Sequence, residues 1–302
     1  MRASALGRRP ELTVFAGALA LAFSGILFRL SHTSPSTGAF YRCLFALPPL
    51  LVVARYEGRR WGGRTLRQRS YAWVAGVFFA ADLIFWHRAI EFVGAGLATV
   101  LSNTQVVLVG LFAWLVWRER PQRSTLLVLP VIVAGIVLVS GVLEVGAYGS
   151  DPAKGTVYGI LTGLAYTGFL LILRSGQRGV VGPAGPLFDA TLTSALACLV
   201  AGLAVGDIDL TPSGPALGWL VVLALSCQWL GWLLVSVSLA RLPAIVTSVS
   251  LMLQPVCSVL FAGAILGESP SGLQLLGAAA ILGGIVVSAL GRRGLAAAEP
   301  AG

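Results

Sequence analysis

Charged residues are scarce in this chain, and sequence patterns typical of soluble or ATP-driven proteins are missing. Only 11% of the 302 residues are charged and 57% are hydrophobic, against about 25% and about 45 to 50% in soluble globular domains. The single lysine, Lys154, is followed by glycine, so the chain lacks the GxxxxGK[ST] phosphate loop. These absences exclude a soluble globular fold and an ATPase within this polypeptide.

Groups suited to catalysis or metal binding are equally few. The chain has two histidines, His32 and His87, and neither an HExxH nor a GxSxG motif. Its four cysteines lie singly in different apolar runs, without the paired spacing of a zinc site or redox couple, and we interpret them as packing residues. We therefore expect no catalytic residues, no metal, no cofactor and no enzymatic activity.

Long apolar runs, by contrast, recur along the whole chain. Each spans about 20 residues, enough for a helix to cross a hydrocarbon layer of about 30 Å. Arg8 and Arg9 before the first run also fit a cleaved signal peptide, but cleavage would leave nine spans and spoil the repeat described below. We predict an all-α integral membrane protein with ten transmembrane helices, at 12–31, 37–55, 71–90, 95–117, 124–143, 155–173, 186–205, 216–238, 244–266 and 271–290.

The arginines between these runs predict the orientation in the membrane. The net charge is +9, but the basic residues are spread between apolar runs rather than gathered on one soluble face, so we expect no nucleic-acid partner. Seventeen arginines fall on the side of the amino terminus, whereas only Arg88 and Lys154 fall on the other. Because basic loops stay in the cytoplasm, we predict a multi-pass protein of the inner or plasma membrane with both termini on the cytoplasmic side.

The sequence also repeats internally. A shift of 149 positions lays residues 95–121 on 244–270 without gaps and pairs Gln105 with Gln254 and Glu119 with Glu268. Each copy holds five predicted crossings, an odd number, so the second copy enters the membrane from the opposite face. We predict two inverted five-helix repeats, 1–151 and 152–302, forming one membrane domain. Inverted repeats are a recurring plan of secondary transporters, whose binding site lies near the midplane where the halves meet.

Three stretches resemble a known family. "DLIFWHRAIEFVGAGLATVLSNTQVVLVGLFAWLVWRERP" and "IVTSVSLMLQPVCSVLFAGAILGESPS" are similar to the paired EamA domains of the drug/metabolite transporter superfamily, and "FYRCLFALPPLL" resembles its arginine-bearing second helix. The resemblance covers nearly the whole chain and implies a ten-helix permease that exports amino acids or other metabolites, without naming the cargo. "WRER" departs from the usual "GER", which leaves the role of Glu119 open.

Uncharged polar groups deep in the predicted helices mark a candidate substrate cavity. Gln105 and Gln254 lie about 15 Å into their helices, and Asn103 is in the adjoining "SNTQ" cluster. An unpaired amide in lipid would cost several kcal/mol, so these side chains must face protein or a wet cavity. The alternative is that they are interhelical hydrogen-bonding residues.

Aromatic residues accompany the polar groups of helices 3 and 8. A shift of 146 positions places Asp82 on Gln228 and Trp86 on Trp232, so we expect each half to offer a polar group beside an indole. Tyr166 is a further candidate for the cavity wall. Aromatic walls with few polar groups suit a small, partly apolar solute; packing or an interface belt is the alternative for the tryptophans.

Asp82 is the deepest carboxylate in "ADLIFWHRAIEF", whereas Arg88 and Glu91 lie toward the helix end, where they can pair. We hold two roles open for Asp82: a structural ion pair with Arg42, the one arginine deep in the second helix, or proton coupling as the cavity opens to each side. The predicted function is secondary transport of a small organic solute, with protons as the candidate coupling ion. A membrane scaffold subunit and, less favoured, an integral-membrane enzyme are the alternatives, and the oligomeric state stays open.

Overall fold

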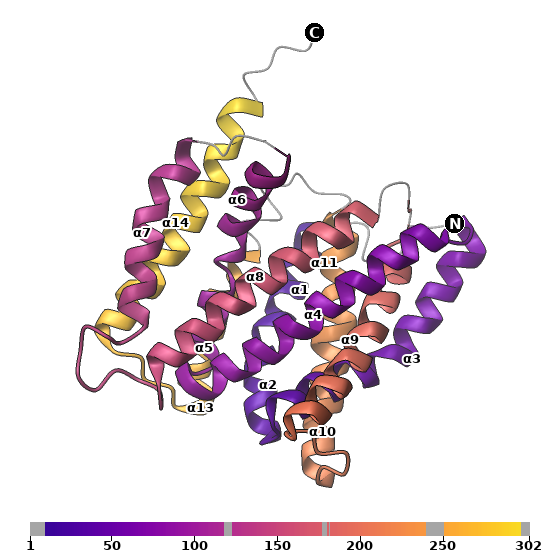
Figure 1. The fold of residues 1–302 in the computed structure, drawn as a ribbon, viewed down its shortest axis with the longest axis horizontal. Coiled ribbons are helices and arrows are strands. Elements are labelled where there is room, and N and C mark those ends of the chain that lie inside the picture. Colours follow the sequence, from indigo (N-terminus) through magenta and orange to yellow (C-terminus); the bar gives the residue numbers. More distant parts are fainter. Residues whose placement is uncertain (1–9, 118–122, 177–179, 181, 240–250, 297–302) are drawn as a thin grey trace.

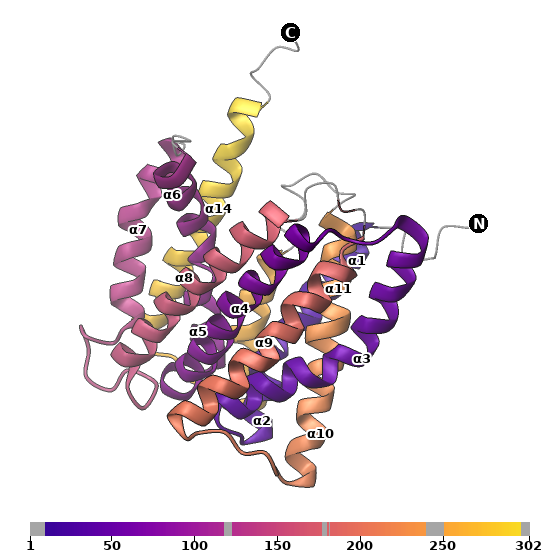
Figure 2. The same ribbon diagram turned by 45° about the vertical axis from the view of Figure 1, so that its right-hand side comes forward.

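The computed structural model describes residues 10–117, 123–176, 180, 182–239 and 251–296, and within these ranges the secondary structure is helical. The helices form one bundle, in which α4 and α8 run diagonally beside each other (Figures 1 and 2). The helices are α1 (Pro10–Ala22), α2 (Ser24–Ser31), α3 (Pro35–Trp61), α4 (Leu66–Val93), α5 (Ala95–Ser102), α6 (Gln105–Trp117), α7 (Arg123–Val139), α8 (Pro152–Gly176), α9 (Ala184–Val205), α10 (Gly214–Leu223), the π-helix η2 (Ala224–Gly231), α11 (Trp232–Leu239), α13 (Leu253–Leu266) and α14 (Gly272–Ala296).

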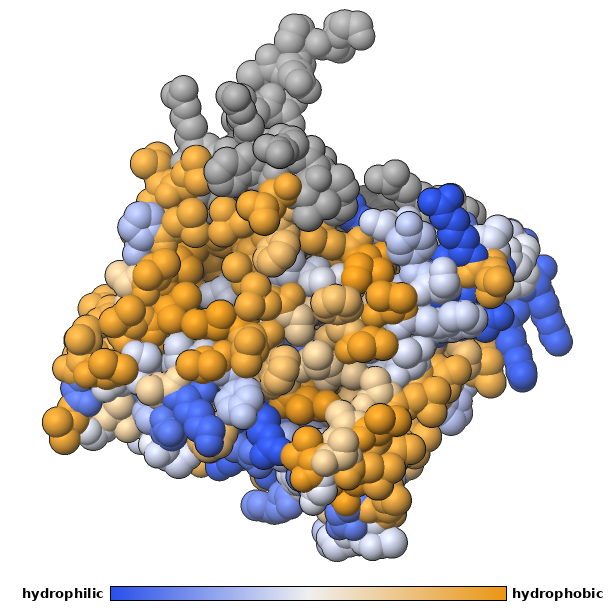
Figure 3. All heavy atoms as spheres, in the orientation of Figure 1, coloured by the Kyte–Doolittle hydropathy of each residue, from blue (hydrophilic) through white to orange (hydrophobic). Residues whose placement is uncertain are grey.

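Each of the ten predicted apolar ranges contains helix in the described residues. Six helical stretches are long and apolar enough to cross a membrane, and four shorter apolar helices accompany them. Large apolar side chains such as Val74, Leu127 and Leu203 are exposed, and apolar atoms cover the middle of the face in Figure 3. An exposed apolar belt is unstable in water and stable in lipid, so the chain is an all-helical, multi-pass membrane protein.

Three predicted spans that we expected to be continuous, the first, the fourth and the ninth, are interrupted. The fourth breaks at Asn103 and Thr104, where side chains also bond backbone carbonyls of the preceding turn: Asn103 Nδ2 donates to the Thr99 carbonyl at 2.8 Å and Thr104 Oγ1 to that of Leu101 at 2.7 Å. The first span breaks at Phe23, between α1 and α2.

The ninth span breaks at the position equivalent to Asn103. Met252 precedes α13 with φ −66° and ψ −17°, and Asn103, 149 positions earlier, ends α5 with φ −69° and ψ −9°. Here Pro255 supplies the reason: it has no amide hydrogen to donate, so it fits the first turn of a new helix. The repeat seen in the sequence is thus present in the backbone. Glu119, Ala244 and the remaining repeat positions up to residue 250 lie outside the described residues.

Helices pair across the halves of the sequence. The third predicted span packs against the sixth (α4 with α8), and the first packs against the eighth (α1 with η2 and α11); the second packs on the seventh, the fourth on the ninth and the fifth on the tenth. If each span is replaced by its equivalent in the other half, so that the first becomes the sixth and the sixth the first, the same five pairs result. The fold therefore contains two related halves with a seam between them.

The bundle ends are joined by charged groups. At the end where α3 meets α4, the buried Asp189 of α9 accepts from Arg64 at 2.7 Å and from the more exposed Arg69 at 3.2 Å, a cluster that the sequence analysis missed although Asp189 lies inside a predicted span. At the opposite end Arg88 contacts Glu91 at 3.6 Å, as predicted, and also Asp207 of the other half at 2.5 Å. These ion pairs connect the two halves on both faces.

A glutamate also links the fourth and ninth spans. Glu268 follows α13, and its carboxylate accepts hydrogen bonds from the backbone amides of Ala95 at 2.6 Å and Gly96 at 3.1 Å, the first residues of α5. An acidic group there complements the positive end of the helix dipole. Burial raises the pKa of this carboxyl, while the two hydrogen bonds and the nearby charge of Arg29 oppose the rise.

Candidate functional site

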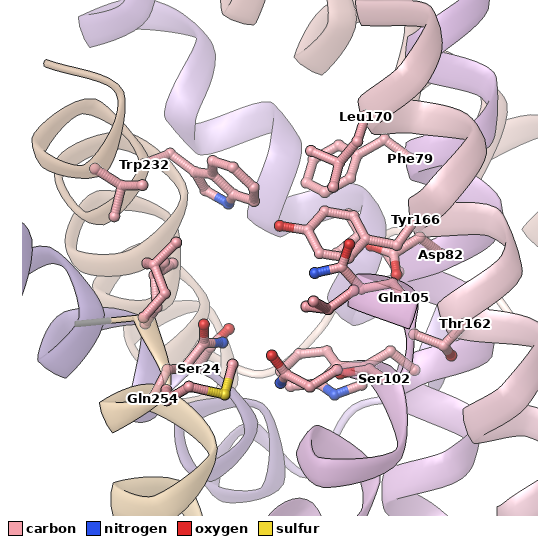
Figure 4. A pocket seen from close by; sticks show the side chains of 18 of the residues that line it. Ser24, Phe79, Asp82, Ser102, Gln105, Thr162, Tyr166, Leu170, Trp232 and Gln254 are labelled. Carbon is pink, nitrogen blue, oxygen red and sulfur yellow. The ribbon is translucent and has the colours of Figure 1, made fainter. Parts of the chain in front are cut away.

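A cavity of about 310 Å³ lies at the seam between the halves. Helices of both halves contribute to its wall, including α3 and α4 from the first and α8, α11 and α13 from the second. Figure 4 shows Trp232 across the hollow from Phe79, Leu170 and Tyr166, and Ser24 and Gln254 across it from Ser102. Eight of the nine predicted site residues line it: Arg42, Asp82, Trp86, Asn103, Gln105, Tyr166, Trp232 and Gln254.

The helix breaks place the amides at the cavity. Ser102 and Asn103 end α5 and Gln105 begins α6, while Gln254 lies in the first turn of α13 just after the break at Met252. Irregular backbone at membrane depth is tolerated where it lines a cavity or is buried in protein. The two glutamine side chains, central in the sequence repeat, are therefore also equivalent in the wall.

Aromatic rings form the apolar part of the wall. The Trp232 ring lies edge-on to those of Phe79 and Tyr166, with each centroid 6.1 Å away. Phe169 stacks behind, 4.6 Å from Phe79 and 5.9 Å from Tyr166. The cluster joins α4, α8 and α11, so it holds rigid rings from both halves against the cavity. Such a surface suits an aromatic or aliphatic group of a solute.

Arg42 is held in a fixed orientation beside the cavity. Its Nε donates to Gln228 Oε1 and its Nη1 to Ser24 Oγ, each at 2.9 Å. The guanidinium carbon also lies 5.7 Å from the centroid of the Trp86 ring, a cation–π distance. Nη2 has no hydrogen-bond acceptor among the described residues, and it is the remaining donor that can serve a ligand.

Asp82 lies in the same wall without bonding to Arg42. A direct ion pair with Arg42, one of the two roles held open for Asp82, is absent from the described part of the chain, where Gln228 and Ser24 accept from two of the guanidinium nitrogens. The Asp82 carboxylate also has no hydrogen-bond donor among the residues that the structure describes. Asp82 is 7% exposed and Arg42 4%, so both charged groups are nearly buried and both line the cavity.

Gln228 is a correction to the predicted site. It does not line the cavity: it is fully buried in η2, where its amide accepts from Arg42 and its Nε2 lies 3.5 Å from Thr191 Oγ1. The irregular π-helical turn carries this polar side chain behind the wall. The sequence match of Gln228 with Asp82 placed both residues near the cavity but could not distinguish the lining position from the one behind it.

Four residues with functional side chains in the wall were missed in the sequence: Ser24, Phe79, Ser102 and Thr162. Ser24 had a usable signal, since "AFSG" at 22–25 matches "AYTG" at 165–168, which contains Tyr166. Ser102 belongs to the "SNTQ" cluster. Phe79 and Thr162 carry no such mark, because a single aromatic or threonine in an apolar helix does not reveal which way it faces.

Comparisons with known proteins agree with this architecture. The model of the EamA-like transporter family matches twice, at residues 8–141 and 153–290. A solved crystal structure with 18% sequence identity has a TM-score of 0.61 and covers 94% of this chain and 98% of its own, which shows a shared fold. A search of curated proteins gave no match.

Proposed function

We propose, from the premise that this chain belongs to the EamA-like transporter family, that it is a secondary transporter of a small organic metabolite, such as an amino acid or a related solute. Export or exchange would proceed by alternating access. The observation that carries the proposal is the cavity of about 310 Å³ at the seam, lined by polar and aromatic side chains of both halves. Sites of this kind lie between the repeats of secondary transporters.

In this proposal the cavity wall binds the solute. Gln105, Gln254 and Asn103 offer hydrogen bonds, and the rings of Trp86, Tyr166 and Trp232 offer an apolar surface. Two charged groups, Asp82 and Arg42, complete the site, with Gln228 positioning Arg42 from behind. Protons are the candidate coupling ion, and Asp82 is the candidate group that carries them. We expect no nucleic acid and no resident cofactor to take part.

The two halves, 1–151 and 152–302, are proposed to be inverted in the membrane. The unchanged pairing of helices after a shift of five spans supports this arrangement, as does the equivalence of the breaks at Asn103 and Met252. Similar halves of opposite orientation can exchange conformations and so give two states of nearly equal energy. Reporter fusions placed at Glu119 and at Glu268 should report opposite sides of the membrane; the same side for both would refute inversion.

The distribution of arginine supports an inner or plasma membrane location with both termini in the cytoplasm. Arg64 and Arg69 lie at one end of the bundle, whereas Arg88 lies at the other. Seventeen arginines share the amino-terminal side by sequence, and basic residues are retained on the cytoplasmic side. The reporter fusions above test this assignment as well.

Transport itself is tested with purified protein in proteoliposomes, screened for uptake and efflux against a broad metabolite panel. We expect saturable movement of a small organic solute that empty liposomes lack. Solutes that move should also raise the thermal unfolding temperature of the protein, since a ligand that binds only the folded state stabilises it. Folded protein that neither moves nor binds any solute would favour a scaffold subunit.

A further inference from the structure

We propose that a second pocket, at the end of the bundle where α3 meets α4, binds the phosphate-bearing headgroup of an anionic phospholipid. The pocket has a volume of about 290 Å³ and shares no lining residue with the cavity at the seam. Both halves contribute to its wall, the first through α3, α4 and the turn between them, the second through residues 180, 182 and 185. The inference does not depend on the proposed transport function.

Two arginines line this pocket and have hydrogen-bond donors to spare. Arg64 Nη1 and Arg69 Nε both donate to the carboxylate of Asp189, at 2.7 and 3.2 Å, so one buried acid is shared between two cations. Arg64 Nε and Nη2 and Arg69 Nη1 have no acceptor among the described residues. A guanidinium presents its donors in a planar fork that matches the oxygens of a phosphate. These free donors therefore suit a phosphate group.

The acid in the described part of the wall, Glu57, already has partners. Its Oε2 accepts from the backbone amides of Ala184 and Gly185, at 2.9 and 3.3 Å, and the charge of Arg64 also lies near it. Residues 55–69 nevertheless hold six arginines and a single acid, and Asp189 adds one more negative charge. Hydrophilic residues gather at this edge of the molecule (Figure 3, right). The surplus of positive charge attracts an anion.

The surroundings of the pocket favour a lipid over a free anion. Tyr56 and Trp61 are both about half exposed; Arg60 donates to the Tyr56 hydroxyl at 3.0 Å and lies 5.7 Å from the centroid of the Trp61 ring. Tyrosine and tryptophan are enriched at the membrane–water interface. Leu66, at the start of α4, is 72% exposed and offers an apolar contact to acyl chains. Basic pockets between helices on the cytoplasmic side bind anionic headgroups, and we propose this arginine-rich end to be cytoplasmic.

Glycines provide the room for the headgroup. Gly58, Gly62 and Gly63 line the pocket, and a Cβ added at any of them would have nothing within 4 Å. Gly62 also has a φ of +92°, which ends α3 in a conformation that glycine adopts without strain. The open volume lies near the lower end of the range of about 300 to 1,000 Å³ for ligand pockets, so it suits a phosphate with its glycerol rather than a large ligand.

Binding is tested first on the unmodified protein. Purified full-length protein in dodecyl maltoside micelles is titrated with dioleoyl phosphatidylglycerol or, as the uncharged comparison, dioleoyl phosphatidylcholine. We expect phosphatidylglycerol to raise the unfolding temperature more strongly, since a ligand that binds only the folded state stabilises it. Added salt should weaken this effect. Inorganic phosphate and glycerol phosphate carry the same chemistry without acyl chains, and we expect them to bind at least about tenfold more weakly, because they bury no apolar surface.

Two variants assign the binding to this pocket. Arg69→Gln should weaken phosphatidylglycerol binding at least about tenfold, the loss of a charge-assisted contact, while Arg64 still pairs with Asp189 and maintains the fold. Arg67→Gln is the matched control, because it removes the same charge from an exposed residue outside the pocket. Gly58→Leu keeps every charge and hydrogen bond but fills open space in the wall, so it should also weaken binding.

Several results would overturn the proposal. Equal stabilisation by phosphatidylglycerol and phosphatidylcholine would show that no anion is selected. Equal affinity for glycerol phosphate and phosphatidylglycerol would mean a soluble anion in place of a lipid. Equal losses in Arg67→Gln and Arg69→Gln would indicate diffuse surface charge, and full binding in both Arg69→Gln and Gly58→Leu would place the lipid elsewhere. Solute movement in the liposome screen is scored separately, so failure of the lipid site leaves the proposed transport function standing.

Discussion

Arg42 and Gln228 lie 186 positions apart in the sequence, yet the Arg42 Nε donates to the Gln228 Oε1 at 2.9 Å inside the bundle. This bond crosses the seam between the two halves and fixes the cation beside the cavity. Gln228 reaches it from a π-helical turn, and such turns are frequent at functional sites. The bond therefore joins the fold to the site, and its loss should be measurable in both.

Replacing Gln228 with Leu should destabilise the protein. The change leaves the Arg42 Nε without an acceptor in a fully buried position, and an unsatisfied buried donor costs about 1 to 3 kcal/mol, more when charged. Thermal unfolding in detergent measures the effect. Gln105→Leu is the matched control, because the Gln105 side chain lines the cavity and its amide group has no hydrogen-bond partner in the described residues. Its effect should appear in solute affinity, and equal destabilisation by both variants would contradict the distinction.

Replacing Asp82 with Asn separates the two roles held open for this residue. If the carboxylate carries protons, the amide cannot release one, so proton-driven accumulation should be lost while exchange at saturating solute continues. Uptake into proteoliposomes with and without a pH gradient measures the first, and counterflow measures the second. Loss of folding together with both activities would instead support a structural pairing with Arg42 in some state of the transport cycle.

Most of the fold and the level of the cavity could be predicted from sequence. Ten apolar runs, the shift of 149 positions and the central amides Gln105 and Gln254 are visible there, because lipid permits few polar residues without a partner. It was harder to predict from the sequence which side of each helix faces the cavity. Gln228 and Asp82 occupy equivalent positions in the sequence match, but one lies behind the cavity and the other lines it.

Long-range partners could not be predicted for a related reason. The cluster of Asp189 with Arg64 and Arg69, and the pair of Arg88 with Asp207, depend on which helices are neighbours. His87 shows the same limit. Its Nδ1 lies 3.0 Å from the Pro35 carbonyl oxygen and its ring is fully buried against Phe28, contacts that the sequence does not reveal.

Replacing Gly159 with Ala should destabilise the contact between α8 and α5. A Cβ added at Gly159 would lie 2.6 Å from the Leu101 Cβ, too close for any carbon pair, so the helices must separate. Overpacking of this kind costs about 1 to 3 kcal/mol, read out as a lower unfolding temperature. Gly218→Ala in α10 is the matched control, since nothing lies within 4 Å of its added Cβ. A neutral Gly159→Ala would show that this crossing is loosely packed.

The Glu268 carboxyl should make stability depend on pH. Burial raises its pKa in the folded protein above the value of about 4.3 for an exposed glutamate. The folded state therefore binds this proton more tightly than the unfolded state does, and the stability that protonation contributes is present at low pH and lost as the pH rises through the raised pKa. The groups facing it are the amides of Ala95 and Gly96, the charge of Arg29 and the Tyr148 ring.

Glu268→Gln tests this pH dependence, because glutamine has the shape of the protonated acid and cannot ionise. Relative to this variant, the natural protein should lose stability as the pH rises from about 4.3, the pKa of an exposed glutamate, through the raised pKa of the folded state, measured by unfolding temperature at several pH values. A relative gain over that range would mean that the hydrogen bonds at the start of α5 outweigh burial.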